Sequence, residues 1–293
     1  MQEINFVDRS FDQDSTGTYS ISIQANLNGL TYCIFDDKIG YYVLFRKHRF
    51  DHVLLVGDLI EKIAEVLEKD ETVNLHFHTV RFLGYTQQST LVPDSFFDRH
   101  KMLEYLAFCH AGDIDHELFN NLITPPGIHN VFALPRELVS VISSHFKKVE
   151  FMNQTTPFLR HVAHQEDSFV KPAMYVGLNP GFFDVACVGD GKLKLYNTFQ
   201  YTNESDLLYY IIFACNQLGF DTRQIPIYLS GEMSSKLSYY EILKQYIPGT
   251  KFDEVVGVPS LAPGLKQLGT VRFLNLLNVQ MCASSAEHTG AEK

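Results

Sequence analysis

The predicted secondary structure repeats along the chain, because each half begins with three strands that lead into alternating helices and strands. In the first half, three segments rich in β-branched and aromatic residues, separated by turn sequences, predict an antiparallel meander at 19–24, 30–35 and 40–48. Apolar residues then recur every three or four positions over 58–69, which predicts an amphipathic helix. This order restricts the fold to mixed α/β architectures.

The first half continues through an irregular stretch at 70–126, which we expect to be an insertion. It contains predicted strands at 72–78 and 89–92 and short helical pieces near 97–108. Regular elements then return, and they are predicted as a strand, a helix, a strand and a helix at 130–134, 135–145, 148–152 and 156–163.

The second half follows a polar linker at 164–172 that ends in proline and is the best domain boundary in the sequence. Its predicted strands are 173–178, 183–188, 193–201, 225–229 and 252–256, and its predicted helices are 205–218 and 235–247. Three antiparallel strands that feed βαβ crossovers form the ribonuclease H-like topology, and two copies form the actin-like ATPase architecture. We therefore predict two ribonuclease H-like domains of mixed sheets and flanking helices, at 1–167 and 168–282, and a disordered tail at 283–293.

Charge and composition exclude several function classes. The 24 Lys and Arg residues against 34 Asp and Glu give a net charge of −10, which repels nucleic acids. Apolar runs such as 207–215 are far shorter than the roughly 20 residues that cross a bilayer. The acidic N-terminus lacks the pattern of a secretory signal, and the five cysteines are odd in number and scattered. These features predict a cytoplasmic protein with no membrane span and no nucleic-acid partner.

Three segments carry a resemblance to a known superfamily. The apolar strand and Pro-led helix at 130–139, with 151–162, resemble the same point in pilus-assembly and cell-division members of the actin-like ATPase superfamily. The segment 174–181 resembles their second phosphate loop, and 227–231 resembles their adenosine-binding strand and glycine turn. The chain is also similar to an uncharacterised family, a domain of unknown function, that shares this fold.

The chain departs from the superfamily where phosphate chemistry is expected. The resemblance implies an Asp followed two residues later by Gly in each phosphate loop, because the carboxylate positions metal-bound water and the glycine admits phosphate. Here the corresponding residues are Gln24-Ala25-Asn26 and Gly177-Leu178-Asn179. Loss of both carboxylates argues against hydrolysis, so we nominate no catalytic residue and no metal ligand.

Nucleotide binding without hydrolysis is a separate alternative. We expect no resident cofactor, and ATP with Mg²⁺ is the alternative. If nucleotide binds, the resemblance implies contacts from the residues of the two loops and the glycine turn, namely Asn26, Asn28, Gly29, Asn179, Gly181, Ser230 and Gly231.

Two hypotheses of function remain, together with a question of assembly. The first is a non-catalytic actin-like scaffold that binds another protein through the insertion 70–126 or between the two halves. The second is an ATPase or small-molecule kinase whose carboxylates come from unexpected positions such as Asp36, Asp184 or Asp206. The question of assembly is a third hypothesis, in which neither the cleft nor nucleotide matters and the chain is an obligate homo-oligomer.

Two histidine pairs have spacings that a metal could use. His76 and His78 would share one face of a strand, and His161 and His164 are about one helical turn apart. No third ligand accompanies the first pair, and the cationic preference of a helix end explains the second. We therefore expect neither pair to bind a metal.

Overall fold

The structure is a computed structural model that describes residues 2–50, 55–111, 116–165, 169–231, 237–254 and 259–285. The chain divides into two compact units. Unit 1 takes its described residues from 1–157, 258–268 and 276–293, and unit 2 takes them from 158–257 and 269–275. The boundary expected at 167/168 lies outside the described residues, as does the part of the expected tail beyond residue 285.

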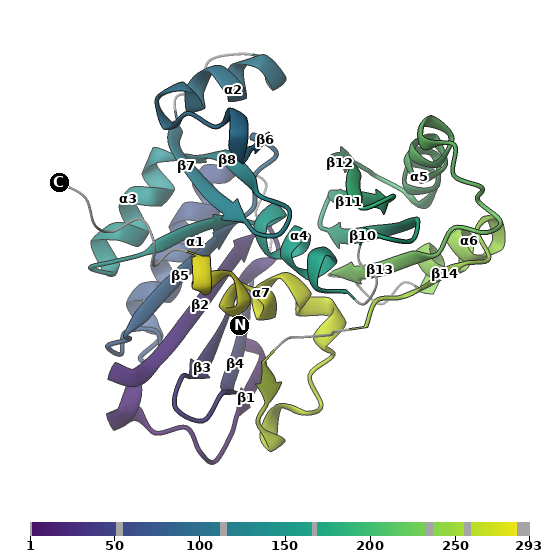
Figure 1. Ribbon diagram of the computed structural model, residues 1–293. Helices are drawn as coiled ribbons and strands as arrows, with labels where there is room; N and C mark the ends of the chain where they lie inside the picture. Colours follow the sequence, from purple (N-terminus) through teal and green to yellow (C-terminus); the bar gives the residue numbers. More distant parts are fainter. Residues whose placement is uncertain are drawn as a thin grey trace. The chain divides into compact units, whose positions relative to one another are not determined.

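Unit 1 is built on a mixed sheet (Figure 1). Its strands are β1 (Gln2–Val7), β2 (Tyr19–Asn26), β3 (Gly29–Asp36), β4 (Tyr41–Arg49), β5 (Thr79–Gly84), β9 (Glu150–Asn153) and β15 (Ser260–Leu261). The order is β1-β4-β3-β2-β5-β9, with β15 beside β4. The meander β2-β3-β4 is antiparallel as predicted, whereas β5 and β9 run parallel to β2.

Two amphipathic helices cover one face of this sheet. They are α1 (Val56–Lys69) and α3 (Arg136–His145). Ile63 of α1 and Ile142 of α3 are fully buried in one cluster with sheet residues such as Ile21 and Phe82. Apolar residues spaced three and four positions apart lie on one face of each helix, and this face packs against the sheet, as expected.

An inserted sheet lies between β5 and α3. Its strands, in the spatial order β6-β8-β7, are β6 (Ser89–Pro93), β8 (Ile128–Pro135) and β7 (His116–Ile123), and it carries the helix α2 (Met102–Cys109). The strand predicted at 130–134 thus exists but belongs to the inserted sheet. The strand predicted at 72–78 is wrong, because that segment is irregular and the strand is β5. Asn74 explains the irregular path, since its side chain donates to the carbonyls of Leu67 and Asp70 and so holds the chain in a turn after α1.

Unit 2 repeats the topology of unit 1. Its strands are β10 (Ala173–Asn179), β11 (Phe182–Gly189), β12 (Lys192–Gln200), β13 (Ile227–Gly231) and β14 (Thr250–Phe252). The spatial order β12-β11-β10-β13-β14 matches β4-β3-β2-β5-β9, which confirms the predicted duplication of ribonuclease H-like folds. Its helices are α5 (Glu204–Leu218) and α6 (Leu237–Tyr246), and α4 (Thr155–His164) runs from one unit into the other.

The end of the described chain returns to unit 1. The helix α7 comprises Leu274–Asn278. After it, the side chains of Val279 and Cys282 pack against Leu83 and Met152. The hydroxyl of Tyr42 donates to the carbonyl of Leu277. Residues 276–282 were predicted in the second domain, whereas they belong to unit 1. Strand β1 was not predicted from the sequence. The described residues also form short 3₁₀ helices, which are η1 (Gln13–Thr18), η2 (Asp94–Phe96), η3 (Arg99–Lys101), η4 (Pro263–Leu265), η5 (Thr270–Phe273) and η6 (Val279–Ser285).

Candidate functional site

The turn between β2 and β3 holds the first three predicted contacts. Asn26 pairs with Gly29 across a two-residue turn, and the side-chain oxygen of Asn26 accepts from the Asn28 backbone N–H at 2.9 Å. A Cβ on Gly29 would lie 2.1 Å from the carbonyl oxygen of His48 on β4. The glycine is therefore required by the close approach of two strands, and the asparagine by the turn itself.

The turn between β10 and β11 holds the next two predicted contacts. Asn179 pairs with Phe182, and Gly181 completes the turn with a φ of +80°. The side-chain amide of Asn179 donates to the carboxylate of Asp184 at 3.0 Å. The backbone carbonyl of Asn179 accepts from the Tyr201 hydroxyl at 3.0 Å. Asn179 is itself buried, so its side chain serves the inside of unit 2.

The end of β13 brings the last two predicted contacts beside β10. Ser230 lies opposite Gly177 and Gly231 lies opposite Leu178 in the parallel pair. Gly231 has a φ of +95°, and a Cβ there would lie 2.1 Å from the Leu178 carbonyl oxygen. The structure thus gathers the four unit 2 residues at the carboxyl-terminal edge of the parallel strands, where ligands bind in open α/β sheets.

Asp184 is the carboxylate nearest to that edge in the pairing of β10 and β11, and it is fully buried. Its oxygens accept from the amide of Asn179, from the Tyr196 hydroxyl at 2.8 Å and from the Thr198 hydroxyl at 2.6 Å. Amide and hydroxyl donors of unit 2 therefore bond to a carboxylate that has no exposed surface. Its position suits a structural anchor inside the sheet better than a ligand for metal-bound water.

The other two alternative carboxylates stabilise turns and helix ends. Asp36 accepts from the backbone N–H of Lys38 at 2.9 Å. Asp206 accepts from the Thr202 backbone N–H at 2.8 Å and from the Thr202 hydroxyl at 2.7 Å, and these bonds lower its pKa. Among the described residues, no group of three His, Cys, Asp or Glu side chains could hold a metal ion.

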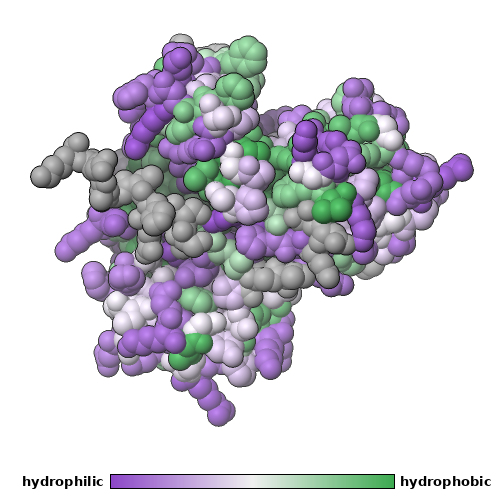
Figure 2. Space-filling model, viewed as in Figure 1, coloured by the Kyte–Doolittle hydropathy of each residue, from purple (hydrophilic) through white to green (hydrophobic). Residues whose placement is uncertain are grey.

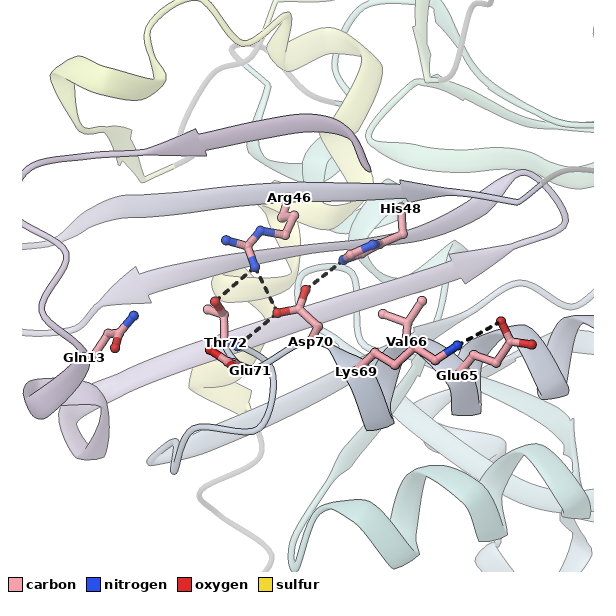
Figure 3. A pocket seen from close by; sticks show the side chains of 9 residues that line it. All are labelled: Gln13, Arg46, His48, Glu65, Val66, Lys69, Asp70, Glu71 and Thr72. Atoms are coloured by element: carbon pink, nitrogen blue, oxygen red, sulfur yellow. Dashed lines mark hydrogen bonds and ion pairs between the residues drawn. The ribbon is translucent and has the colours of Figure 1, made fainter. Parts of the chain in front are cut away.

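Unit 1 contains a polar cavity of about 630 Å³ that the sequence analysis did not predict (Figure 3). Strand β4 supplies Arg46 and His48, and the end of α1 with the turn after it supplies most of the opposite wall (Figure 3). The lining residues are Gln13, Arg46, His48, Glu65, Val66, Lys69, Asp70, Glu71 and Thr72.

Asp70 is the centre of the hydrogen bonds at this cavity. One of its oxygens accepts from the Arg46 guanidinium and the Thr72 backbone N–H, both at 2.9 Å. The other lies 2.8 Å from the Tyr32 hydroxyl and 2.8 Å from His48 Nε2. Burial alone would raise the pKa of Asp70, but the bonds from His48 and Tyr32 and the charge of Arg46 outweigh it and lower the pKa well below its usual range.

This arrangement acts as a clamp between α1 and the sheet. All the acceptor positions of Asp70 face donors within unit 1, and its side chain is only 4% exposed. The outer wall mixes two carboxylates, Glu65 and Glu71, with the Lys69 ammonium, so it favours neither anions nor cations. A sequence signal existed, because strand β4 ends in the basic run 46–49, in which Arg46 and His48 share one face.

Among the described residues, neither histidine pair belongs to a group of three or more His, Cys, Asp or Glu side chains that could hold a metal ion. His76 and His78 lie in the irregular segment before β5, not on a strand. His161 is buried, and its Nε2 lies 2.8 Å from a carboxylate oxygen of the buried Asp253, a contact that the sequence did not predict. His164 instead contacts the carbonyl of Arg160 through Nδ1 at 2.8 Å. Both histidines lie in the last turn of α4, as the sequence predicted, whereas the partner of His161 could not be predicted because Asp253, after β14, comes from a distant part of the sequence.

Comparisons with known proteins agree with this fold. A family model described as protein of unknown function DUF3822 matches residues 8–249. A protein of unknown function from Bacteroides thetaiotaomicron VPI-5482, with an actin-like ATPase fold, is 17% identical with a TM-score of 0.79, and the match covers 93% of this chain and 99% of that one. A chain of the PilM-PilN type IV pilus biogenesis complex is 9% identical with a TM-score of 0.61, covering 90% and 97% respectively. No curated protein matches.

The two structural likenesses show the actin-like ATPase fold that the sequence predicted. Within the described part of the chain, no helix combines the length and the apolar character needed to cross a bilayer.

Proposed function

The chain belongs to the DUF3822 family, whose function is unknown, and we propose that it is a non-catalytic actin-like scaffold that binds a protein partner without hydrolysing nucleotide. One observation carries the proposal. Asp184, which lies opposite Gly177 of the expected phosphate loop of unit 2, is fully buried and accepts hydrogen bonds from Asn179, Tyr196 and Thr198.

The chemistry of phosphoryl transfer supports this proposal. The reaction depends on groups that hold a metal ion and neutralise charge as it develops on the phosphate. In this chain Gln24 and Gly177 stand where the two loop carboxylates are expected. Asn26 and Asn179, two residues later in each loop, make side-chain hydrogen bonds within their own turn or strand pair. The glycines Gly29 and Gly231 are explained by close contact between strands, so their presence is no sign of a phosphate site.

A protein-binding role draws support from one of the structural relatives. That relative is described as part of a complex of PilM with PilN, so an actin-like chain of this size is found there with a protein partner. We transfer to this chain the general role, which is to bind a protein, and not the identity of the partner.

The test measures turnover and binding separately on the full chain. Phosphate release from ATP with Mg²⁺ should stay at the level of a buffer control, and millimolar ATP with Mg²⁺ should not raise the midpoint of thermal unfolding. Nucleotide at 100 times its Kd would stabilise the chain by about 2.7 kcal/mol, a shift that is easily measured. Phosphate release that disappears in Asp36→Asn, Asp184→Asn or Asp206→Asn, with the variant still folded, would refute the proposal in favour of an ATPase or kinase.

A raised unfolding midpoint without phosphate release would mean that the chain binds nucleotide but does not hydrolyse it. The edge formed by β10 and β13 would then be the expected binding site. The matched control is Gly181→Ala, where the side chain would enter open space beside the turn. Loss of the ATP-induced shift in that variant would place the nucleotide at the turn.

A further inference from the structure

The polar cavity of unit 1 contains a guanidinium group whose hydrogen-bond donors are only partly used inside the unit. Arg46 Nε donates to Asn5 at 3.1 Å, and Arg46 Nη1 donates to Asp70 at 2.9 Å and to Thr72 at 3.0 Å. The second terminal nitrogen, Nη2, takes part in none of these bonds and points away from Asp70, on the side where Gln13 lies (Figure 3). The two N–H groups of Nη2 therefore face the cavity.

The bonds inside unit 1 fix the direction of this guanidinium group. The side chain of Arg46 is 14% exposed, and that of its partner Asp70 is only 4% exposed. Asp70 is held in turn by the Tyr32 hydroxyl and by His48 Nε2, each at 2.8 Å. A long side chain normally loses rotamer freedom when it binds a ligand, and this loss costs affinity. Because Arg46 has already lost that freedom, it is preorganised to bind an acceptor.

The outer wall of the cavity adds a further donor and a negative charge. The side chains of Gln13 and Glu71 form no hydrogen bond or ion pair with another residue that the structure describes. Glu65, by contrast, accepts from Lys62 at 3.1 Å and lies 4.0 Å from the Lys69 ammonium group, so its charge is already compensated. The cavity thus offers N–H donors from one set of residues and a carboxylate from another.

A lining with groups of both signs disfavours ligands with a single charge. An anion bound at Arg46 would bring its charge into the same cavity as Glu71, and a cation bound at Glu71 would lie in the same cavity as Arg46. Like charges brought together lower the affinity. A small molecule with both a carboxylate and an ammonium group satisfies the two sides at once. Val66 adds an apolar surface to the lining, which suits an apolar side chain.

We propose that the cavity of unit 1 binds a free α-amino acid with an apolar side chain. The carboxylate accepts from Arg46 Nη2 and Gln13, the ammonium group lies against Glu71, and the side chain lies toward Val66. The volume of about 630 Å³ is within the range of small-molecule sites, roughly 300–1,000 Å³. No residue of this cavity belongs to the edge formed by β10 and β13, so the proposal goes beyond the scaffold function and does not depend on it.

The first experiment tests both charges of the ligand on the full chain. Thermal unfolding is measured with each of the natural amino acids at millimolar concentration, and at least one with an apolar side chain should raise the midpoint by about 2 °C or more. Its N-acetyl derivative lacks the ammonium group and its methyl ester lacks the carboxylate, so neither should raise the midpoint. The proposal is overturned if no amino acid raises the midpoint, or if either derivative raises it as much as the free amino acid does.

The second experiment places the ligand by isothermal titration calorimetry with the amino acid that gave the largest shift. Glu71→Gln removes the charge that faces the ammonium group and should weaken binding at least about tenfold. Gln13→Glu puts a negative charge beside the ligand carboxylate and should weaken binding by a similar factor. The matched control is Glu68→Gln, which removes an exposed charge of α1 outside the cavity and should leave the affinity unchanged. Equal affinities of Glu71→Gln and Glu68→Gln chains would overturn the proposal.

An exposed apolar surface elsewhere is the alternative place for an apolar amino acid. Figure 2 shows apolar side chains gathered over the region where Figure 1 places α2, and Phe108 of that helix is 91% exposed. Phe108→Ser should leave the affinity unchanged. Binding that is lost in Phe108→Ser but kept in Glu71→Gln would place the amino acid on α2 and would also overturn the proposal.

The outcome is separable from that of the scaffold function. Absence of amino-acid binding, without phosphate release from ATP, would remove the ligand of the cavity and leave the scaffold function standing. Phosphate release from ATP would remove the scaffold function and leave the cavity as it is. Gln13 and Glu71 are both exposed, so we expect their variants to unfold at the wild-type midpoint without ligand. If either variant fails to fold, the two derivatives of the first experiment still decide the proposal on the wild-type chain.

Discussion

Replacing Asp70 by Asn tests whether the cavity of unit 1 is built around one charge. The variant keeps the size of the side chain but removes the negative charge that faces Arg46 and His48 (Figure 3). Its amide also presents one acceptor oxygen where the carboxylate presents two, so two of the four donors lose their acceptor. The Tyr32 hydroxyl is the most affected of these, since burial followed by the Asp70 charge raises its pKa and keeps it a donor.

The expected cost follows from the burial of the group. Removing one partner of a buried ion pair costs about 3–5 kcal/mol, and the small exposure of Arg46 and His48 lets water recover part of this. We therefore expect a loss of about 3 kcal/mol in the free energy of unfolding of unit 1, or roughly 10 °C in its midpoint. Asp94→Asn is the matched control, because its carboxylate is 67% exposed and pairs with His129 at the surface. That variant should change stability by less than about 1 kcal/mol.

The assay must separate the two units. The chain has no tryptophan, so circular dichroism follows unfolding, and hydrogen exchange with mass spectrometry shows which unit opens. Because the folded pKa of Asp70 is lowered, its stabilising effect is complete above the unfolded pKa and disappears as pH falls toward the folded pKa. The difference between wild type and Asp70→Asn should thus shrink below about pH 4. A loss of unfolding free energy under about 1 kcal/mol at pH 7, or a loss that does not depend on pH, would refute the role of Asp70 in joining α1 to the sheet.

Three further predictions concern unit 2 and the cysteines. Gly231→Ala should destabilise unit 2 by about 4 kcal/mol, since a Cβ meets the neighbouring strand at positive φ, whereas Gly181→Ala in open space should cost about 1 kcal/mol in the same urea titration. Asp184→Asn should lower the stability of unit 2 by about 2 kcal/mol and leave phosphate release at the buffer level. In native protein at pH 8, a thiol reagent should label Cys109 alone of the five cysteines, because the others are buried and burial raises the pKa of Cys215, for example, to about 11. Rapid labelling of a second cysteine would contradict the burial.

The duplicated fold could be predicted because its signals are local. The meander of β2, β3 and β4 is encoded by turn residues and β-branched segments, and α1 and α5 by spacing and caps that lie within the helices themselves. Asn203, for instance, caps α5 by accepting from two backbone N–H groups one turn ahead. Each half carries the same order of such signals, so the topology followed without knowledge of any contact between distant residues.

The missed features depend on specific side-chain contacts, several of them between residues far apart in the sequence. The strand was predicted too early, at 72–78 rather than at β5, because 72–78 has a strand-like composition. The hydrogen bonds of Asn74 to the end of α1 and the turn after it outweigh that preference. Residues 276–285 return to unit 1 through Tyr42, Leu83 and Met152, partners more than 100 residues away. The cavity around Asp70 likewise joins β4 to the turn after α1. No periodicity within one segment encodes such pairings.

The seven predicted contacts show why a likeness in fold is weak evidence of chemistry. Each glycine and asparagine that resembled a phosphate-loop residue lies at the expected turn or strand end. Gly29 and Gly231 are there because a neighbouring backbone comes within reach of a Cβ, which any chain with this strand pairing requires. Asn179 and Asp184 bond to each other inside the sheet. The topology alone thus accounts for Gly29 and Gly231, and only a carboxylate left open at the edge would have indicated catalysis, so the assignment of function depends on residues that the topology does not require.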